Sequence, residues 1–179
     1  MLKSKKKEKP TNWIIEQIKL IAPKRKIQIL DFASGNGRNS IYLAEKNRII
    51  TAIDKDSNKL DNYKNFNYIN TICFDLETNE EWPLKNEYYD IIIVVNYLYR
   101  PKIKKLINLL KKGGYLFYET FSLGNEKFGS PKNLDYLLRD RELINIFSKE
   151  TEILNYFNGK VFERQFSIKQ RCLIKKRRL

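Results

Sequence analysis

The sequence predicts an α/β fold built on a doubly wound, mostly parallel sheet of seven strands, completed by a C-terminal hairpin with one reversed edge strand. Two observations carry this prediction. Strand patterns alternate with helical patterns over most of the chain, which is typical of a parallel sheet covered by helices. The last part of the chain instead holds two strand patterns in succession, which indicates an antiparallel hairpin at the sheet edge.

The first half of the chain alternates between short apolar runs and helical spacing. Ile14, Ile18 and Ile21 recur at helical spacing, and Asn39 is a plausible N-cap of the second helix. The second strand ends on Asp54. In order, we expect a helix that is entered at Pro10-Thr11 and runs up to Pro23, a strand at 27–32, a helix at 40–46, a strand at 48–53, a helix at 58–63 and a strand at 69–74.

The second half of the chain continues the alternation of strand and helix patterns, and it ends with two strand patterns in succession. The block from Tyr89 to Val95 is apolar and largely β-branched after Asp90, so we expect it in the middle of the sheet. Gly113-Gly114 is expected to end a helix, because glycine is favoured just past a helix C-terminus. In order, we expect a strand at 89–95, a helix at 102–112, a strand at 115–119, a polar loop at 121–132, a helix at 141–147 and strands at 153–156 and 162–175.

Length and composition predict a single domain. The 179 residues are 42% hydrophobic, enough for one sizeable core. We expect residues 1–10, which are rich in lysine, to form a disordered basic tail, and residues 11–179 to form the domain. No run approaches about 18 apolar residues and the start has no apolar signal region, so we expect a cytoplasmic protein without a membrane span.

The chain contains no histidine and two cysteines. The absence of histidine excludes a histidine general base, a Ser-His-Asp triad and every histidine-containing zinc or iron site. Acid–base chemistry must then come from Asp, Glu, Tyr, Lys or water. Cys73 and Cys172 fall in predicted strands without the spacing of a disulfide framework or a metal site, so we expect two buried thiols and no metal.

The formal net charge is +14, from 35 Lys and Arg against 21 Asp and Glu. The clusters of basic residues at 3–9 and 175–178 could bind the phosphates of a nucleic acid backbone. However, the chain is also crowded with Ile, Asn, Tyr and Phe, which A/T-rich codons favour along with lysine. A nucleic-acid partner is therefore an alternative that we do not favour over a solvated face and a frayed tail.

The stretch from Ile29 to Asp54 carries the strongest functional signal. An apolar strand leads into Asp31-Phe32-Ala33-Ser34-Gly35-Asn36-Gly37, a helix follows, and the next strand ends on a carboxylate. Glycines in such a loop let a ligand approach the backbone, and the second acid suits ribose hydroxyls. The stretch predicts a nucleoside-type cofactor.

Asp31 favours one type of cofactor over the others. A carboxylate at the end of the first strand would repel a pyrophosphate, but it suits a cofactor with a cationic amino acid head, such as S-adenosylmethionine. In addition, Ser40 stands where the dinucleotide pattern has its third glycine. A nicotinamide or flavin cofactor, or a turn without a ligand, are the weaker alternatives.

With these motifs, residues 13–174 resemble the class I S-adenosylmethionine-dependent methyltransferases, which have a Rossmann-like fold. The family's first motif matches Asp31-x-Ala33-x-Gly35-x-Gly37, with Ala33 in place of the usual first glycine. The run at 30–39 followed by Tyr42-Leu43-Ala44 further resembles the small tellurite-resistance and thiopurine-type branch. The motifs at 75–77, 82–83, 96–101 and 119–121 are in keeping with that branch.

The resemblance implies which residues hold the methionine part of the cofactor. The backbone from Ala33 through Gly35 to Gly37 would cradle it, and Asp31 would lie close to its ammonium group. Asn96, at the end of the fourth strand, would approach the same part.

The resemblance also implies which residues hold the nucleoside. Asp54 would accept both ribose hydroxyls, and Asp75 would accept from the adenine amino group. The backbone of Leu76 would meet the ring edge, and Trp82 would pack either by the adenine or in the core. The structural alternatives are a surface turn for Asp54 and an N-cap or turn for Asp75.

Methyl transfer requires mainly alignment and exclusion of water, so the substrate is expected at the C-terminal edge of the sheet, beneath the loop at 121–132 as a candidate lid. Tyr97 would form a wall, Arg100 would bind an anionic substrate, and Glu119 would take a proton or orient the nucleophile. The alternatives are packing for the tyrosine, and helix caps or a mutual ion pair for Arg100 and Glu119.

The leading hypothesis is a methyltransferase for a small molecule such as a thiol, an oxyanion or a carboxylate, because no further domain remains to grip a macromolecule. An RNA methyltransferase and a non-catalytic S-adenosylmethionine-binding module are the alternatives. Asn96-Tyr97 lacks the two prolines found in enzymes that methylate amino groups of bases, so that activity is disfavoured. The sequence leaves the oligomeric state open.

Overall fold

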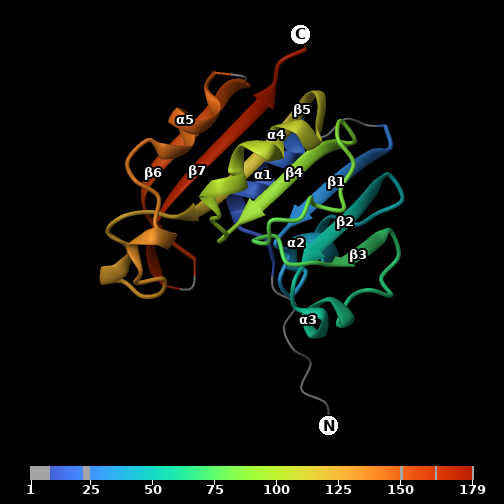
Figure 1. Ribbon diagram of the computed structural model, residues 1–179, viewed down its shortest axis with the longest axis horizontal. Coiled ribbons are helices and arrows are strands. Elements are labelled where there is room, and N and C mark those ends of the chain that lie inside the picture. The colour runs from blue at the N-terminus through green and yellow to red at the C-terminus, as the bar shows by residue number, and fades with distance from the viewer. Residues whose placement is uncertain (1–8, 22–24, 150, 164, 179) are drawn as a thin grey trace.

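The computed structural model describes residues 9–21, 25–149, 151–163 and 165–178. Figure 1 shows one twisted sheet with helices packed against it. The strand order is β3-β2-β1-β4-β5-β7-β6. In chain order the elements are α1 (Asn12–Ile21), β1 (Ile27–Phe32), α2 (Arg38–Leu43), β2 (Arg48–Asp54), α3 (Ser57–Asp61), β3 (Ile69–Cys73), β4 (Tyr89–Val95), a 3-10 helix (Arg100–Lys105), α4 (Leu106–Leu109), β5 (Leu110–Phe121), two short 3-10 helices (Asn125–Lys127 and Leu134–Tyr136), α5 (Glu142–Phe147), β6 (Thr151–Phe162) and β7 (Phe166–Lys176).

The sheet confirms the predicted fold class. The pairs among β1, β2, β3, β4 and β5 are parallel, whereas β7 is antiparallel to both β5 and β6. The reversed strand is therefore β7, and β6 lies outside it at the edge. The apolar strand β4 lies between β1 and β5, in the middle of the sheet as its composition predicts.

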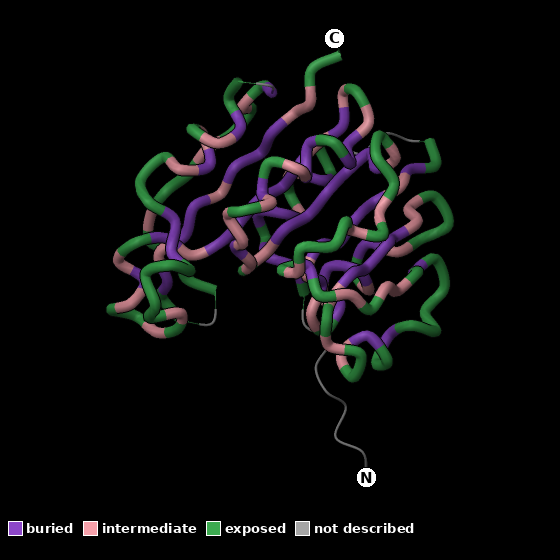
Figure 2. Tube along the Cα trace, viewed as in Figure 1, coloured by how far each residue is buried: buried purple, intermediate pink, exposed green. Residues whose placement is uncertain are grey.

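Each face of the sheet is buried under its own helices. In β1, Leu30 and Phe32 belong to one core while Ile27 and Ile29 belong to the other, as the two-residue period of a strand requires. The first core also takes side chains of α4 and α5, and the second takes those of α1, α2 and α3. Figure 2 shows the resulting continuous burial along the central strands.

The prediction of one helix at 102–112 is wrong, because the α-helix there is much shorter. Residues 100–105 form a 3-10 helix, α4 has one turn, and Leu110 already pairs with Tyr89 of β4. The next pair is Ile91 with Tyr115, so the residues between Leu110 and Tyr115 form a bulge. A Cβ on Gly114 would stand 2.9 Å from the Lys111 oxygen. The two glycines therefore shape a bulge in β5 instead of capping a helix.

The C-terminal hairpin is longer than predicted, and its turn falls inside the strand predicted at 162–175. β6 ends at Phe162 and β7 begins at Phe166, and both side chains are exposed, at 66% and 48%. Lys169 of β7 is buried although it is charged, because its ammonium group pairs with the buried Glu119 at 2.7 Å.

The two cysteines differ from each other. Cys172 is buried, and burial raises the pKa of its thiol to about 12. Cys73 ends β3 and is exposed, so the prediction of a buried thiol is wrong there. Among the described residues, no group of His, Cys, Asp and Glu side chains has the arrangement of a metal site.

Two expectations concern the ends of the chain. The basic tail predicted for residues 1–10 lies outside the described residues except for Lys9 and Pro10, and Pro10 is buried. At the other end, Lys176 pairs with Glu87 while Arg177 and Arg178 are exposed. Within the part of the chain that the structure describes, no helix is long and apolar enough to cross a membrane.

Candidate active site

A cleft of about 1070 Å³ opens at the carboxyl ends of β1, β4 and β5. One wall is the loop after β1, from Ala33 to Asn39, and Asn96 follows from β4. The opposite wall is the β6–β7 hairpin, and the segment from Lys9 to Trp13 closes one side. Sites for small molecules occupy this position in open α/β sheets.

The loop after β1 exposes its backbone. Ala33, Gly35 and Gly37 adopt φ values of 56°, 53° and 71°, in the left-handed region that glycine tolerates. A Cβ on Gly37 would lie 2.6 Å from the ring of Tyr63, whereas one on Gly35 would meet nothing within 4 Å. Tyr63 Oη bonds Ser34 Oγ at 2.8 Å and the Gly35 oxygen at 3.2 Å, which holds the loop from beneath. The space beside Gly35 is open to a ligand.

Asp31 lies beneath this loop and is buried. Its Oδ2 accepts from the backbone nitrogen and hydroxyl of Ser40, at 3.0 and 2.7 Å, and its Oδ1 accepts from Asn39 Nδ2 at 3.2 Å. The helix prediction needs correction here, because α2 begins at Arg38 and the side chain of Asn39 binds Asp31 instead of capping the helix. Asn39 Oδ1 is buried without a hydrogen-bond partner among the described residues.

Burial raises the pKa of the Asp31 carboxyl from 3.8 to about 6, although its hydrogen bonds oppose the shift. Between these two pH values the folded chain keeps a proton that the unfolded chain has lost. The free energy of unfolding therefore falls as the pH rises through this window, by about 3 kcal/mol in total. Urea unfolding of the wild type and of Asp31→Asn between about pH 4 and pH 7 measures the difference, because the other groups titrate alike in both proteins. A wild type that gains stability over the variant as the pH rises would contradict the prediction.

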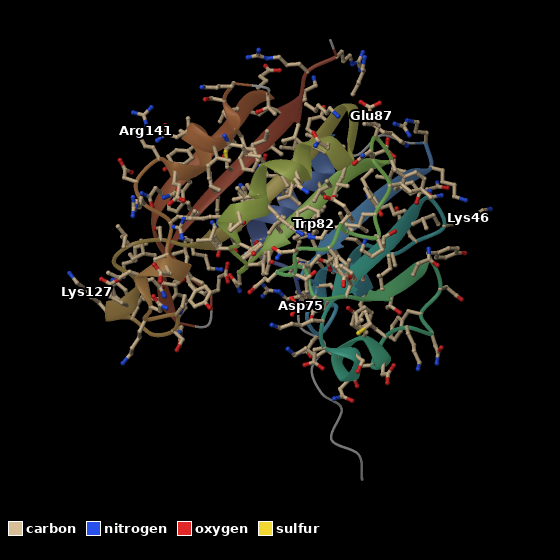
Figure 3. The ribbon with its side chains drawn as sticks, viewed as in Figure 1. Lys46, Asp75, Trp82, Glu87, Lys127 and Arg141 are labelled. Carbon is tan, nitrogen blue, oxygen red and sulfur yellow. The ribbon has the colours of Figure 1, made fainter. Side chains whose placement is uncertain are left out.

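The residues predicted to hold the nucleoside lie beside the loop, outside the wall of the cleft. Asp54 ends β2, and its two oxygens accept from the backbone nitrogens of Gly35 at 2.8 Å and Asp56 at 3.0 Å. Asp75 is exposed, and its Oδ1 accepts from the nitrogen of Glu77 at 3.0 Å, so its turn role is present in the structure. Figure 3 shows Asp75 well apart from Lys127, which belongs to the loop after β5.

Leu76 and Trp82 are joined by a hydrogen bond. Trp82 Nε1 donates to the Leu76 oxygen at 3.1 Å, and its ring packs edge-on against Phe32 with centroids 4.8 Å apart. Leu76 itself is buried. Trp82 thus packs at the border of the core, close to the backbone expected to meet the adenine.

The segment after β4 holds the next predicted residues. Asn96 has φ of 56°, is exposed and lines the cleft, and its backbone nitrogen donates to the Glu119 oxygen at 2.8 Å. The ring of Tyr97 packs against Phe32, and its hydroxyl is buried without a partner among the described residues. Burial and the nearby Glu77 and Asp75 raise the pKa of Tyr97, so its hydroxyl is protonated.

Arg100 and Glu119 do not pair with each other. Arg100 binds both oxygens of Glu142, at 2.6 and 3.0 Å, and donates to the backbone oxygens of Asp135 and Leu137, the latter at 2.8 Å. Arg100 also lies outside the cleft wall. Its observed contacts fix the segment before α5, and its role as a substrate ligand stays a prediction.

Glu119 is fully buried at the floor of a charged cluster. Its Oε1 accepts from Lys169 Nζ at 2.7 Å, and its Oε2 accepts from Arg171 Nε at 2.7 Å and from Thr11 Oγ1 at 3.3 Å. Its oxygens therefore already hold two cations and a hydroxyl. The proton-transfer role predicted for Glu119 is not tested by these contacts.

Sequence reasoning missed the cations of the hairpin. Lys169 and Arg171 line the cleft together with Glu163, which contacts both. Lys169 and Arg171 are two residues apart on one strand, so their side chains lie on the same face, and this spacing could have predicted a pair of neighbouring cations. Their partner could not be found that way, because the register that sets Glu119 opposite Arg171 joins residues far apart in the chain.

Comparisons with known proteins show the family and the fold of this chain. A family model described as tellurite resistance protein TehB matches residues 3–170. No curated protein sequence matches the chain significantly. The crystal structure of TehB from Haemophilus influenzae is 22% identical, with a TM-score of 0.72, and the match covers 92% of this chain and 61% of that one. This chain therefore spans about three fifths of the length of that relative.

Two further structures show the same fold. A TehB-like S-adenosylmethionine-dependent methyltransferase from Corynebacterium glutamicum is 19% identical, with a TM-score of 0.66, and the match covers 90% of this chain and 86% of that one. An S-adenosylmethionine-dependent methyltransferase from Methanosarcina mazei is 16% identical, with a TM-score of 0.70, and the match covers 92% of this chain and 97% of that one. Because the family model spans nearly the whole sequence, the chain belongs to the tellurite resistance protein TehB family, and its fold is that of the S-adenosylmethionine-dependent methyltransferases.

Proposed function

We propose that this S-adenosylmethionine-dependent methyltransferase acts on a small-molecule acceptor, such as a thiol, an oxyanion or a carboxylate. The observation that carries the proposal is that the loop after β1 and the β6–β7 hairpin line the same cleft. Its volume of about 1070 Å³ is slightly above the usual range of about 300 to 1,000 Å³ for small-molecule sites. That volume suits the methionine part of the cofactor together with a small acceptor.

The described residues fit the cofactor. The open space beside Gly35 and the left-handed backbone from Ala33 to Gly37 suit the methionine part. Asn39 Oδ1, a buried oxygen with no partner among the described residues, is an acceptor for the ammonium group next to Asp31. Asn96 would approach the same part from β4.

On the nucleoside side, Asp54 would exchange its contacts with backbone nitrogens for the ribose hydroxyls, a bidentate role that suits a carboxylate. Asp75 and the backbone of Leu76 would meet the adenine. When bound, S-adenosylmethionine supplies a methyl group on a positively charged sulfur.

The protein's contribution is alignment and exclusion of water. A thiolate or carboxylate acceptor arrives already ionised, so the reaction requires no strong general base. That chemistry is in keeping with a chain that has no histidine and with Glu119 held in two ion pairs. Tyr97 would then wall the site, and Glu119 would orient the cations that face the acceptor.

Transfer of labelled methyl from S-adenosylmethionine into an extract of cells lacking the protein tests the proposal. We expect label in the small-molecule fraction, with none when Gly35→Ala replaces the wild type. Nuclease-sensitive label in large products would overturn the proposal in favour of RNA methylation. Tight binding of S-adenosylhomocysteine without any labelled product would overturn it in favour of a cofactor-binding module.

A further inference from the structure

Lys169 and Arg171 project from the same face of β7 into the cleft. Glu119 holds both from the buried side, at 2.7 Å each, and its side chain is 0% exposed. The side chains of Lys169 and Arg171 are 3% and 17% exposed. Breaking either of these short, shielded pairs would leave a buried charge without a close partner, so we expect both to persist when a ligand binds.

A second carboxylate contacts the same two cations from the cleft side. Glu163, just after β6, lies 3.4 Å from Lys169 Nζ and 3.2 Å from Arg171 Nη2. Both contacts are longer than those of Glu119, and the Glu163 side chain is 30% exposed. Longer and more exposed ion pairs are weaker, so Glu163 is the replaceable partner of the two.

The net charge of the cluster indicates what kind of ligand group could take the place of Glu163. Two cations and two carboxylates make the cluster neutral. Without Glu163, the cluster of Lys169, Arg171 and Glu119 carries one positive charge. It then suits a ligand group with a single negative charge, held by the donors that Glu163 releases.

Apolar side chains of β6 adjoin this position. Phe157, Val161 and Phe162 line the same cleft, and the two phenylalanines are 38% and 66% exposed. Large exposed apolar groups gathered at a cleft indicate a binding surface. An inorganic oxyanion would leave these rings in water, whereas an organic anion would cover them.

We infer that the acceptor is an organic monoanion, whose charged group displaces Glu163 from Lys169 and Arg171 and whose apolar body covers Phe162 and Phe157. The inference rests on the proposed function and narrows its class of substrate. Glu163 is then a specificity-determining residue, because only an anion that binds the two cations better than this internal carboxylate enters the site.

Calorimetric titration in the presence of S-adenosylhomocysteine tests the inference, with phenylacetate, acetate, phenylacetamide and sulfate as probes. We expect phenylacetate to bind roughly tenfold more tightly than each of the others, because it alone combines one negative charge with an apolar ring. Equal binding of phenylacetamide would overturn the need for charge. Equal binding of acetate or sulfate would overturn the need for an apolar body.

Two variants test the residues. Glu163→Gln should tighten phenylacetate binding roughly tenfold, because the site no longer has to release an internal carboxylate. Glu152→Gln, which removes the same charge from an exposed position of β6 outside the cleft, is the matched control and should change nothing. An unchanged affinity in Glu163→Gln would overturn the displacement.

Phe162→Ala should weaken phenylacetate binding about fivefold and leave acetate unaffected. Leu154→Ala, at another exposed position of β6 outside the cleft, is its control. An equal loss in both variants would overturn the assignment of the apolar body. These titrations require no methyl transfer, so a chain that binds phenylacetate without transferring a methyl group would contradict the proposed function and leave the binding site standing.

Discussion

Replacing Glu119 by glutamine is expected to lower the free energy of unfolding by about 3 kcal/mol. The Glu119 carboxylate is fully buried and neutralises Lys169 and Arg171 at 2.7 Å each. Glutamine keeps the shape and an acceptor oxygen but removes the charge, so the Lys169 ammonium, 3% exposed, is left with Glu163 at 3.4 Å as its nearest counter-charge. A buried ammonium group without a close counter-charge is costly. Urea unfolding at neutral pH measures the loss.

A double-mutant cycle provides the control for this prediction. Lys169→Met should also destabilise, and the double variant Glu119→Gln/Lys169→Met should recover part of the loss, because it buries no unpaired ammonium. A strictly additive double variant would contradict a coupled pair. The same proteins separate two roles of Glu119: if folded Glu119→Gln binds S-adenosylhomocysteine and keeps its turnover, Glu119 positions the cations and does not transfer a proton.

The sequence predicted the parts of the fold that depend on local patterns. The bounds of β1 and β4 agree with prediction, because both are short, mostly apolar blocks flanked by polar residues or turns. It failed at Leu110–Gly114, where the residue spacing fits a helix as well as a strand. What decides there is pairing with β4, a contact between segments about twenty residues apart. Helical spacing in a short stretch cannot report such a partner.

The candidate site divides in the same way. The positions of the loop from Asp31 to Gly37 after β1 and of Asp54 at the end of β2 could be predicted, because one strand–loop–helix–strand unit contains them all. Their roles toward a cofactor stay predictions. The role of Asn39 was misassigned, since a polar residue before a helix resembles an N-cap whether or not a buried acid lies beneath it. The cluster of Lys169, Arg171 and Glu119 was missed because it forms only when the hairpin docks on β5.

Substitution by alanine should affect the two glycines of the loop differently: Gly37→Ala should mainly lose stability, and Gly35→Ala should mainly lose cofactor binding. Gly37→Ala is expected to destabilise by about 3 kcal/mol or more, because it combines a left-handed φ with a Cβ placed 2.6 Å from the ring of Tyr63. That ring is 1% exposed and bonded to Ser34, so it has little room to yield. Gly35→Ala adds only the cost of the left-handed φ, about 1 kcal/mol, because its Cβ meets nothing within 4 Å.

The empty surroundings of Gly35 are the reason that its variant should lose function while it keeps its fold. We propose that the methionine part of the cofactor approaches the backbone at Gly35, where the added methyl group would stand, so we expect S-adenosylhomocysteine to bind roughly a hundredfold more weakly. Urea unfolding and calorimetry on both variants provide the test, each protein serving as the control for the other. If Gly35→Ala binds S-adenosylhomocysteine like the wild type, the methionine part does not lie over this loop. If Gly37→Ala is as stable as Gly35→Ala, the ring of Tyr63 does not restrict the side chain at position 37. The predicted pair of results, one variant unfolded easily and the other folded but unable to bind, arises only if the same loop is packed against the core on one side and open to the cofactor on the other.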